Sequence, residues 1–388
     1  MKIGILTLYY KNYNYGGLLQ SYALQNILKR YNSACEQICV DIQYSHIEQD
    51  KNRSFWYWLR KFPWRVLDAI KRMNIVKRIV ETRMSERETA FRSFEVQIPH
   101  SKIIYNKENY RALSDQYDVI VVGSDQVWAN WLPDRVFQIY TAEGGFGNSR
   151  LVSYAASISS QKISDIHREM LQKNLKGFSH ISVREETAKA QLEELLPEKE
   201  IKVVCDPVLL LSREDWDQVA KTPDIQGKYI VCYFLGQVKW HRDFAKAVAN
   251  QKQIPILYFP YIKSGKISFQ ELTWGDIRNY DADPGEFIGL IKNAEMIITD
   301  SFHAMVFSVI YHKEFYVLLR NSKENQNSMN DRIFDFVKRF GLEKQLVQEE
   351  AQRKELRELN SIIDYQKVER QMSEQKIEAI NYIENMLI

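Results

Sequence analysis

Short apolar runs recur along the chain and alternate with segments of helical periodicity. Runs rich in β-formers stand at residues 2–8, 38–42, 118–122, 151–156 and 296–299. Four of them lead into short polar or glycine-containing segments, as a strand does where it enters a loop. Consecutive apolar residues without alternation indicate strands that are buried on both faces, as in a parallel sheet. The pattern therefore predicts an α/β fold.

A polar stretch divides the chain. Residues 212–227 contain Pro and Gly, and the strand-helix pattern restarts after them. Because 388 residues exceed one ordinary core, we expect two domains. We predict a first Rossmann-like domain over residues 1–212, a second over 213–345 and a closing C-terminal helical segment over 346–388. Polar residues at strand ends in both domains imply a central cleft, which is a GT-B-like architecture.

Residues 51–98 interrupt the alternation and are expected to form a helical insertion in the first domain. Aromatic and basic residues crowd positions 55–65, and residues 51–83 hold ten Lys and Arg against Asp68 and Glu81. Tryptophan and tyrosine favour membrane interfaces, and basic side chains favour anionic lipid. The insertion either packs as a hairpin on its own domain or contacts a membrane surface or a lipid-linked substrate.

Composition narrows the class of protein. Hydrophobic residues make up 45% and charged residues 27%, which is ordinary for a globular protein, and a net charge of +3 gives no bulk attraction to nucleic acid. The chain enters a strand at once, without a signal peptide or a bilayer-spanning apolar run, so we expect a cytoplasmic protein. Its four cysteines lack metal spacing and are expected to be reduced and packed, with a Cys35–Cys39 disulfide or metal pair as the alternative.

The turn after the run at 296–299 carries the strongest candidate chemistry. A helix is expected to begin there, capped by Asp300 or Ser301, with His303 in its first turn. A helix N-terminus at the carboxyl end of a strand attracts anions, and an imidazole transfers protons near neutral pH. The alternative is a capped core helix with a structural histidine.

Polar groups also follow other strands. Asn14, Gly16 and Gly17 follow the first strand, where the glycines either admit a ligand or form only a tight turn. Ser124 and Asp125 follow the strand at 118–122 and could contact a sugar or cap their loop.

An arginine ends another strand. Arg184 follows the run at 180–183, and its planar fork suits a phosphate or a carboxylate. A surface salt bridge with Glu185 or Glu186 is the alternative.

Six motifs resemble, in order, the polysaccharide pyruvyl transferase family over about residues 1–340. They are Asn14-Tyr15-Gly16-Gly17 with Leu19-Gln20-Ser21-Tyr22-Ala23-Leu24, then Val121-Val122-Gly123-Ser124-Asp125-Gln126-Val127-Trp128, Ser153-Tyr154-Ala155-Ala156-Ser157, Ser182-Val183-Arg184-Glu185, Cys205-Asp206-Pro207-Val208-Leu209-Leu210 and Ile298-Thr299-Asp300-Ser301-Phe302-His303. The resemblance implies a GT-B-like fold and formation of a pyruvate ketal. Phosphoenolpyruvate, the co-substrate, gives its enolpyruvyl carbons to two hydroxyls of one sugar in a cell-surface glycan precursor, and phosphate leaves. It implies no metal and no further cofactor.

The resemblance also suggests roles for single residues. The family's functional histidine corresponds to His303, and its donor-binding arginine to Arg184. Many members have Arg-Leu-His where this chain has Ser301-Phe302-His303, so one anion-binding arginine is missing.

Further roles follow from the chemistry that this donor requires. We expect Asp300 to orient His303 or to cap the helix. Ser301, at the helix N-terminus, is expected to help Arg184 hold the donor. Arg320 and Arg332, at the edges of a polar segment, are expected to close over the donor and replace the missing arginine. The candidate acceptor-binding residues are Asn14, Gly16, Gly17, Ser124, Asp125 and Glu286, the last of which alternatively caps its helix.

The expected partners are phosphoenolpyruvate and a lipid-linked or nucleotide-linked sugar, with peripheral contact at the inner face of the cell membrane and no nucleic acid. Two other functions remain open: a GT-B glycosyltransferase that uses a nucleotide sugar, and a non-catalytic glycan-binding protein.

Overall fold

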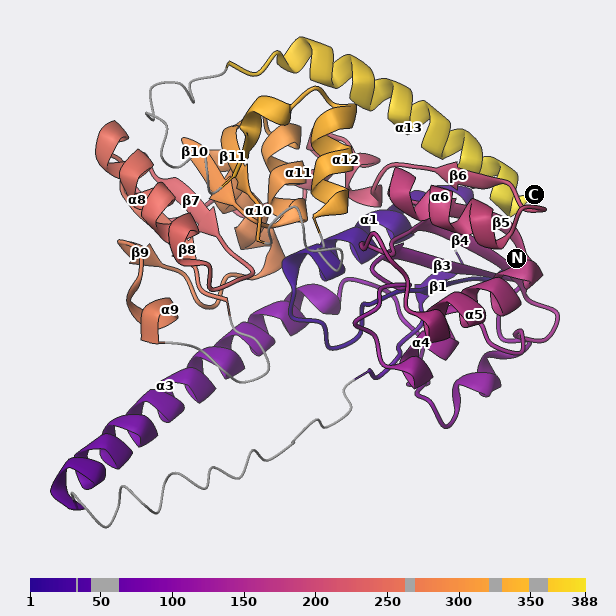
Figure 1. The fold of residues 1–388 in the computed structure, drawn as a ribbon, viewed down its shortest axis with the longest axis horizontal. Coiled ribbons are helices and arrows are strands. Elements are labelled where there is room, and N and C mark those ends of the chain that lie inside the picture. Colours follow the sequence, from indigo (N-terminus) through magenta and orange to yellow (C-terminus); the bar gives the residue numbers. More distant parts are fainter. Residues whose placement is uncertain (33, 43–62, 262–268, 321–329, 349–361) are drawn as a thin grey trace.

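Two parallel six-stranded sheets, each covered by helices, form the molecule (Figure 1). The computed structural model describes residues 1–388 except 33, 43–62, 262–268, 321–329 and 349–361, and gives only the backbone of 63–77, 269 and 270. The first sheet has the order β2-β1-β3-β4-β5-β6 and the second β12-β11-β10-β7-β8-β9. The predicted α/β fold of two Rossmann-like halves is confirmed.

The strands are short, and the central strands of both sheets are buried along most of their length. Those of the first sheet are β1 (Ile3–Leu6), β2 (Cys35–Gln37), β3 (Val119–Asp125), β4 (Arg150–Ala156), β5 (Phe178–Val183) and β6 (Ile201–Val203). Those of the second are β7 (Ile230–Tyr233), β8 (Ile256–Phe259), β9 (Ile277–Arg278), β10 (Met296–Thr299), β11 (Glu314–Leu318) and β12 (Leu346–Val347). The expected strand at 38–42 is wrong. The Ile38 amide still donates to the Ile5 carbonyl of β1, but Cys39 and Asp41 exchange backbone hydrogen bonds with Tyr105, so the chain leaves the sheet after Ile38.

Helices connect the strands and cover the sheets. They are α1 (Tyr15–Tyr31), α3 (Pro63–Glu95), α4 (Asp134–Tyr140), α5 (Asp165–Asn174), α6 (Glu186–Leu195), α7 (Arg213–Asp217), α8 (Lys239–Lys252), α9 (Phe269–Thr273), α10 (Pro284–Asn293), α11 (Phe302–Ile310), α12 (Asp331–Arg339) and α13 (Tyr365–Leu387). Short 3-10 turns lie at Tyr110–Leu113, Leu175–Gly177, Pro207–Leu209 and Glu343–Gln345.

The two sheets are joined by apolar packing. One cluster of buried side chains runs from Ile5 and Leu19 of the first half to Val231 and Phe287 of the second. At its centre the ring of Tyr15 stacks on that of Phe287 with centroids 4.1 Å apart. This packing holds the carboxyl ends of both sets of strands against one another.

Helix α13 connects the two halves a second time (Figure 1). Near its start the Tyr365 hydroxyl donates to the Lys313 carbonyl of the second half. Near its end the Tyr382 hydroxyl donates to the Ser153 carbonyl of β4 at 2.8 Å, and Ile383 and Met386 are buried. The helix therefore fixes one half relative to the other.

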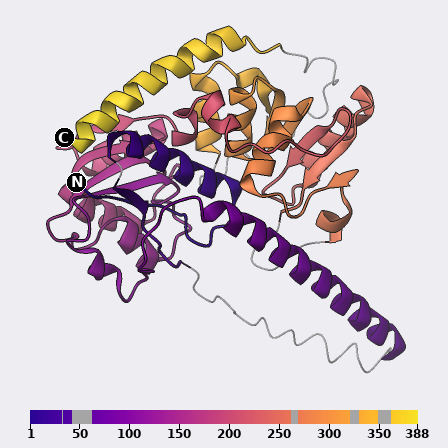
Figure 2. The ribbon, with the colours of Figure 1, turned by 180° about the vertical axis from the view of Figure 1, so that it is seen from behind.

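Helix α3 extends far from the rest of the molecule (Figures 1 and 2). Its C-terminal half packs inward through Val80, Arg87, Phe91 and Phe94, which are all buried. The predicted insertion is therefore helical from Pro63 to Glu95, and its aromatic stretch at 55–62 lies outside the described residues.

Candidate functional site

His303 of the second half reaches into the first half. Ser301 is the N-cap of α11 and accepts from the Ala304 amide, which places His303 in the first turn. The imidazole is buried, and its Nε2 lies 3.5 Å from Oδ2 of Asp206, which follows β6. A methyl group at Gly16 would lie 2.0 Å from Nδ1, so the ring rests directly on the start of α1. The histidine is therefore enclosed by strand ends of both sheets.

Arg184 lies beside it, held by three carboxylates. The guanidinium donates to Asp206 at 2.7 Å and to Asp125 and Glu185 at 3.4 Å each. Asp206 thus joins Arg184 to His303. Burial alone would raise the pKa of Asp206, but its interactions with His303 and Arg184 hold it well below its usual range. Asp206 is therefore ionised and ties the cation of one half to the imidazole of the other.

Arg332 supplies a second buried guanidinium at the same place. It lies 5.7 Å from the Phe302 ring centroid, and Arg184 lies 4.7 Å from the same centroid. Its nearest carboxylate oxygen, on Asp125, is 4.0 Å away, and its Nε has no hydrogen-bond partner among the described residues. Burial, with the neighbouring charges of Arg184 and Arg320, lowers its pKa to about 10, so it stays cationic at neutral pH. Among the described residues, Arg332 is therefore the arginine of this pair that has a side-chain nitrogen without a hydrogen-bond partner.

A small cavity adjoins this pair of guanidiniums. It has a volume of about 10 Å³ and is lined by residues that include Arg184, Asp206, Phe302 and Arg332. That is about the space of one water molecule, so a donor can enter only if side chains part. The expected closing segment at 321–331 lies largely outside the described residues, although Arg320 and Arg332 themselves are described.

Asp300 lies elsewhere than expected. Its Oδ1 accepts from the Leu235 amide at 2.6 Å, and its Oδ2 lies 3.5 Å from His241 Nδ1 and 4.0 Å from Arg320 Nε. It neither caps α11 nor approaches His303, so neither role expected for it fits. Asp206, and not Asp300, is the carboxylate next to the imidazole.

The candidate acceptor residues divide into two sets. Asp125 and Gly16 lie against the arginine–histidine cluster, as described above. Asn14 is the N-cap of α1, accepting from the Gly16 amide at 2.9 Å, and Gly17 packs on Asn12. The peptide bond between Gly123 and Ser124 is cis, and the Ser124 carbonyl accepts from Thr7.

Glu286 is separate from these residues. Its carboxylate accepts from the Asp283 amide at 3.0 Å, and Asp283 accepts from the Glu286 amide, which is a capping box at the start of α10. The structure therefore gives Glu286 the alternative role, that of a helix cap.

The residues of this site that the sequence reasoning missed are Asp206 and Phe302. Asp206 directly follows a short apolar run, as Asp300 does, so the same signal could have singled it out. No local pattern shows that Phe302 supports two guanidiniums, because Arg184 and Arg332 are distant in sequence.

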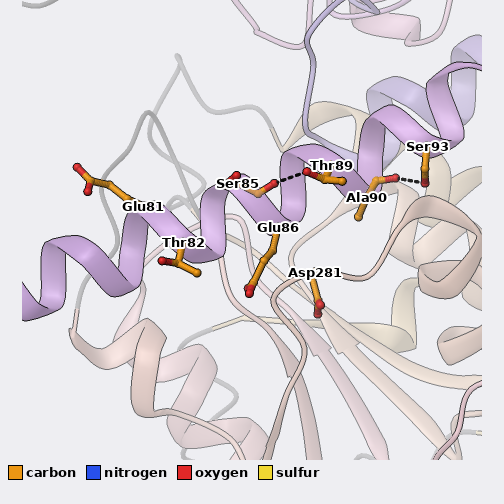
Figure 3. A pocket seen from close by; sticks show the side chains of 8 residues that line it. All are labelled: Glu81, Thr82, Ser85, Glu86, Thr89, Ala90, Ser93 and Asp281. Atoms are coloured by element: carbon orange, nitrogen blue, oxygen red, sulfur yellow. Dashed lines mark hydrogen bonds between the residues drawn. The ribbon is translucent and has the colours of Figure 1, made fainter.

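A groove along α3 is a poor site for an anion (Figure 3). It has a volume of about 710 Å³ and is lined by Asp281 and one face of the helix. The side chains that line it include three carboxylates and four hydroxyls but no basic group: Glu81, Thr82, Ser85, Glu86, Thr89, Ala90, Ser93 and Asp281. Its charge would repel a donor that carries a phosphate and a carboxylate.

Three other features bear on the class of protein. Within the described ranges, no group of three or more His, Cys, Asp or Glu side chains is arranged to hold a metal ion. All four cysteines are buried and unpaired with each other. Among the helices that the structure describes, none combines the length and apolar run needed to cross a bilayer.

The fold of this chain is similar to those of solved structures of sugar enzymes. The UDP-GlcNAc 2-epimerase of Methanocaldococcus jannaschii has a TM-score of 0.50 at 13% identity and covers 96% of this chain and 92% of its own. MnaA of S. aureus, solved with UDP, has a TM-score of 0.53 at 13% identity and covers 100% and 97%. Such low identities show a shared GT-B-like fold and nothing finer.

Comparison of sequences identifies the family. No curated protein matches the chain. A family model described as polysaccharide pyruvyl transferase matches residues 14–322, a span that contains Gly16, Arg184, Asp206 and His303. The chain therefore belongs to the polysaccharide pyruvyl transferase family.

Proposed function

We propose that this protein transfers a pyruvyl group from phosphoenolpyruvate to two hydroxyls of one sugar, forming a ketal and releasing phosphate. The observation that carries the proposal is the pair of buried guanidiniums, Arg184 and Arg332, stacked on Phe302 beside His303. A small donor with a phosphate and a carboxylate needs two such cations, because each bidentate pair satisfies one anionic group.

The reaction requires one proton at carbon and two attacks by oxygen. The donor's methylene carbon accepts a proton and becomes a methyl group, while one sugar hydroxyl adds to the adjacent carbon and loses its proton. A second hydroxyl then displaces the phosphate from that carbon and loses its proton in turn, which completes the ketal. His303 is the group placed to move one of these protons, a role worth about 10²–10⁴ in rate.

Asp206 and Arg332 have distinct roles in this scheme. Asp206 faces His303 Nε2 at 3.5 Å and orients the imidazole that we assign to the proton transfer. Arg332, with an unused Nε–H, is the cation we assign to the donor anion that the missing family arginine would hold. Arg184 is bonded to three carboxylates, so it orders Asp125 and Asp206 and offers the second N–H of Nη1 and of Nη2 to the donor's other anionic group.

Turnover tests this function. The protein is incubated with phosphoenolpyruvate and lipid-linked or nucleotide-linked sugars, and phosphate release is measured. We predict that His303→Gln lowers kcat by about a hundredfold or more with the fold intact. His180→Gln, on β5 and away from the arginine cluster, is the matched control and retains the rate. A His303→Gln variant at wild-type rate removes the imidazole from the mechanism.

The same assay separates the alternatives. A glycosyltransferase is suggested by the fold shared with an enzyme solved with UDP, and it would consume a nucleotide sugar without phosphoenolpyruvate. A glycan-binding protein would bind sugar without any turnover.

We further propose that the protein works in the cytoplasm, in peripheral contact with the inner face of the cell membrane. The support is the excess of Lys and Arg with tryptophan and tyrosine over residues 51–83. We predict co-sedimentation with anionic vesicles but not neutral ones at low salt, and its loss at high salt, because screening weakens attraction to charged lipid. Equal recovery with both kinds of vesicle, or none with either, contradicts this contact.

A further inference from the structure

Arg87 is a buried cation without a counter-charge in the described part of the chain. It lies on α3, is 5% exposed, and forms no ion pair there. Its Nη2 donates to the Tyr13 carbonyl at 3.5 Å, and its Nη1 has no hydrogen-bond partner among the described residues. Arg184 and Arg242, also buried, are by contrast paired with carboxylates. An uncompensated buried guanidinium costs free energy, which an anionic ligand would return.

Aromatic rings hold this guanidinium in place. It lies 4.7 Å from the Tyr15 ring centroid and 5.1 Å from that of Phe91. Tyr15 in turn packs against Tyr233 and Phe259, the last residues of β7 and β8, with ring centroids 5.5 and 5.8 Å away. The insertion therefore places Arg87 near the carboxyl ends of the second sheet, where α/β folds bind ligands.

Two further groups at these strand ends complement Arg87. Arg320 follows β11, with its Nε 4.0 Å from Asp300, and Tyr261 follows β8. Burial raises the pKa of Tyr261, and the charges of both Arg320 and Arg87 oppose that rise. A methyl group at Gly236, which follows β7, would lie 3.4 Å from the Arg320 side chain, and Tyr261 follows β8, the strand paired with β7. Arg320 and Tyr261 therefore lie at the same strand ends as the rings that hold Arg87.

We propose that Arg87, Arg320 and Tyr261 form a second anion site, which takes the phosphate or diphosphate group that carries the acceptor sugar. Two cations and a hydroxyl donor match the several oxygens of such a group. Arg320 lies 4.0 Å from Asp300, in the turn that leads into Phe302 and His303, so this site adjoins the guanidinium pair assigned to the donor. The acceptor's role rests on the proposed function, whereas the anion site itself does not.

Calorimetry with inorganic pyrophosphate tests the site. The variant is Arg87→Met, which keeps the length of the side chain and removes its charge. The matched control is Arg83→Met, one turn earlier, where the guanidinium is bonded to Glu86 at 2.8 Å and lies over the Tyr280 ring. We expect wild type and Arg83→Met to bind alike and Arg87→Met to bind at least about tenfold more weakly.

Two other outcomes overturn the site. It falls if wild type binds no pyrophosphate, or if Arg87→Met binds it as tightly as wild type. The melting temperature of Arg87→Met distinguishes a ligand-binding role of Arg87 from a purely structural one. Removing an uncompensated buried charge leaves the melting temperature unchanged or raises it, whereas loss of a structural arginine lowers it.

Further probes identify the source of the phosphate. The affinities of UDP and of a short-chain polyprenyl diphosphate sugar are measured with wild type and with Arg87→Met. The ligand that binds wild type more tightly and loses more affinity in the variant is of the class that carries the acceptor sugar. Phosphoenolpyruvate affinity should stay unchanged in Arg87→Met. If the variant loses pyrophosphate but wild type never releases phosphate from phosphoenolpyruvate, the site stands and the proposed function falls.

Discussion

Asp206 is the residue through which the two halves of the site are coupled. It accepts from Arg184 at 2.7 Å and lies 3.5 Å from His303, and it is buried with both. One carboxylate between a guanidinium and an imidazole keeps each of them oriented. Removing one member of such a buried group leaves a charge uncompensated, which costs about 3–5 kcal/mol.

The lowered pKa of Asp206 makes a prediction about pH. A carboxyl group whose pKa is lower in the folded state stabilises the fold above its ordinary pKa of 3.8, and that stability is lost as the pH falls through the lowered value. We predict that Asp206→Asn lowers the free energy of unfolding at neutral pH, and that the deficit shrinks toward about pH 3. Urea unfolding of both proteins from about pH 7 to about pH 3 measures it. A deficit that does not change with pH contradicts the assignment.

At the scale of elements, the contact between the starts of α1 and α11 sets the geometry of the site. The ring of His303 lies where a side chain at Gly16 would stand, so glycine is required by close approach of another element. Helix propensity alone would favour alanine at this position by about 0.5–1 kcal/mol.

We predict that Gly16→Ala displaces the imidazole and lowers kcat by about a hundredfold, because a misplacement of about 1 Å at a reacting group costs that much. Gly177→Ala is the control, since no atom lies within 4 Å of a methyl group there. Steady-state kinetics and circular dichroism of both variants measure the effect. A Gly16→Ala enzyme with wild-type kcat shows that the ring position is not critical.

At the scale of the whole molecule, local pattern predicted the fold and part of the site. The buried runs at β3 and β10 and the helices after them follow from hydrophobic periodicity, and α13 lies within the helical segment expected over 346–388. The edge strands β9 and β12 escaped notice because each has only two residues.

The partners of the site residues could not be read from the sequence. Asp206 and His303 lie almost a hundred positions apart, and their pairing depends on how the two sheets pack. The roles expected for Asp300 failed for the same reason, because a strand end does not show which way its side chain turns. A role for Arg87 could not be predicted from the sequence, because it is one of many basic residues in its helix and differs from the other described ones by its burial.

The central claim is that the guanidinium pair at the junction of the two sheets binds phosphoenolpyruvate. The most direct measurement is the affinity for phosphoenolpyruvate by calorimetry, compared between wild type, Arg332→Gln and Arg168→Gln. Arg168 is an exposed arginine bonded to Glu194 and serves as the control. The account predicts that Arg332→Gln weakens binding by at least about tenfold while Arg168→Gln binds as wild type does. Unchanged affinity in Arg332→Gln would contradict it.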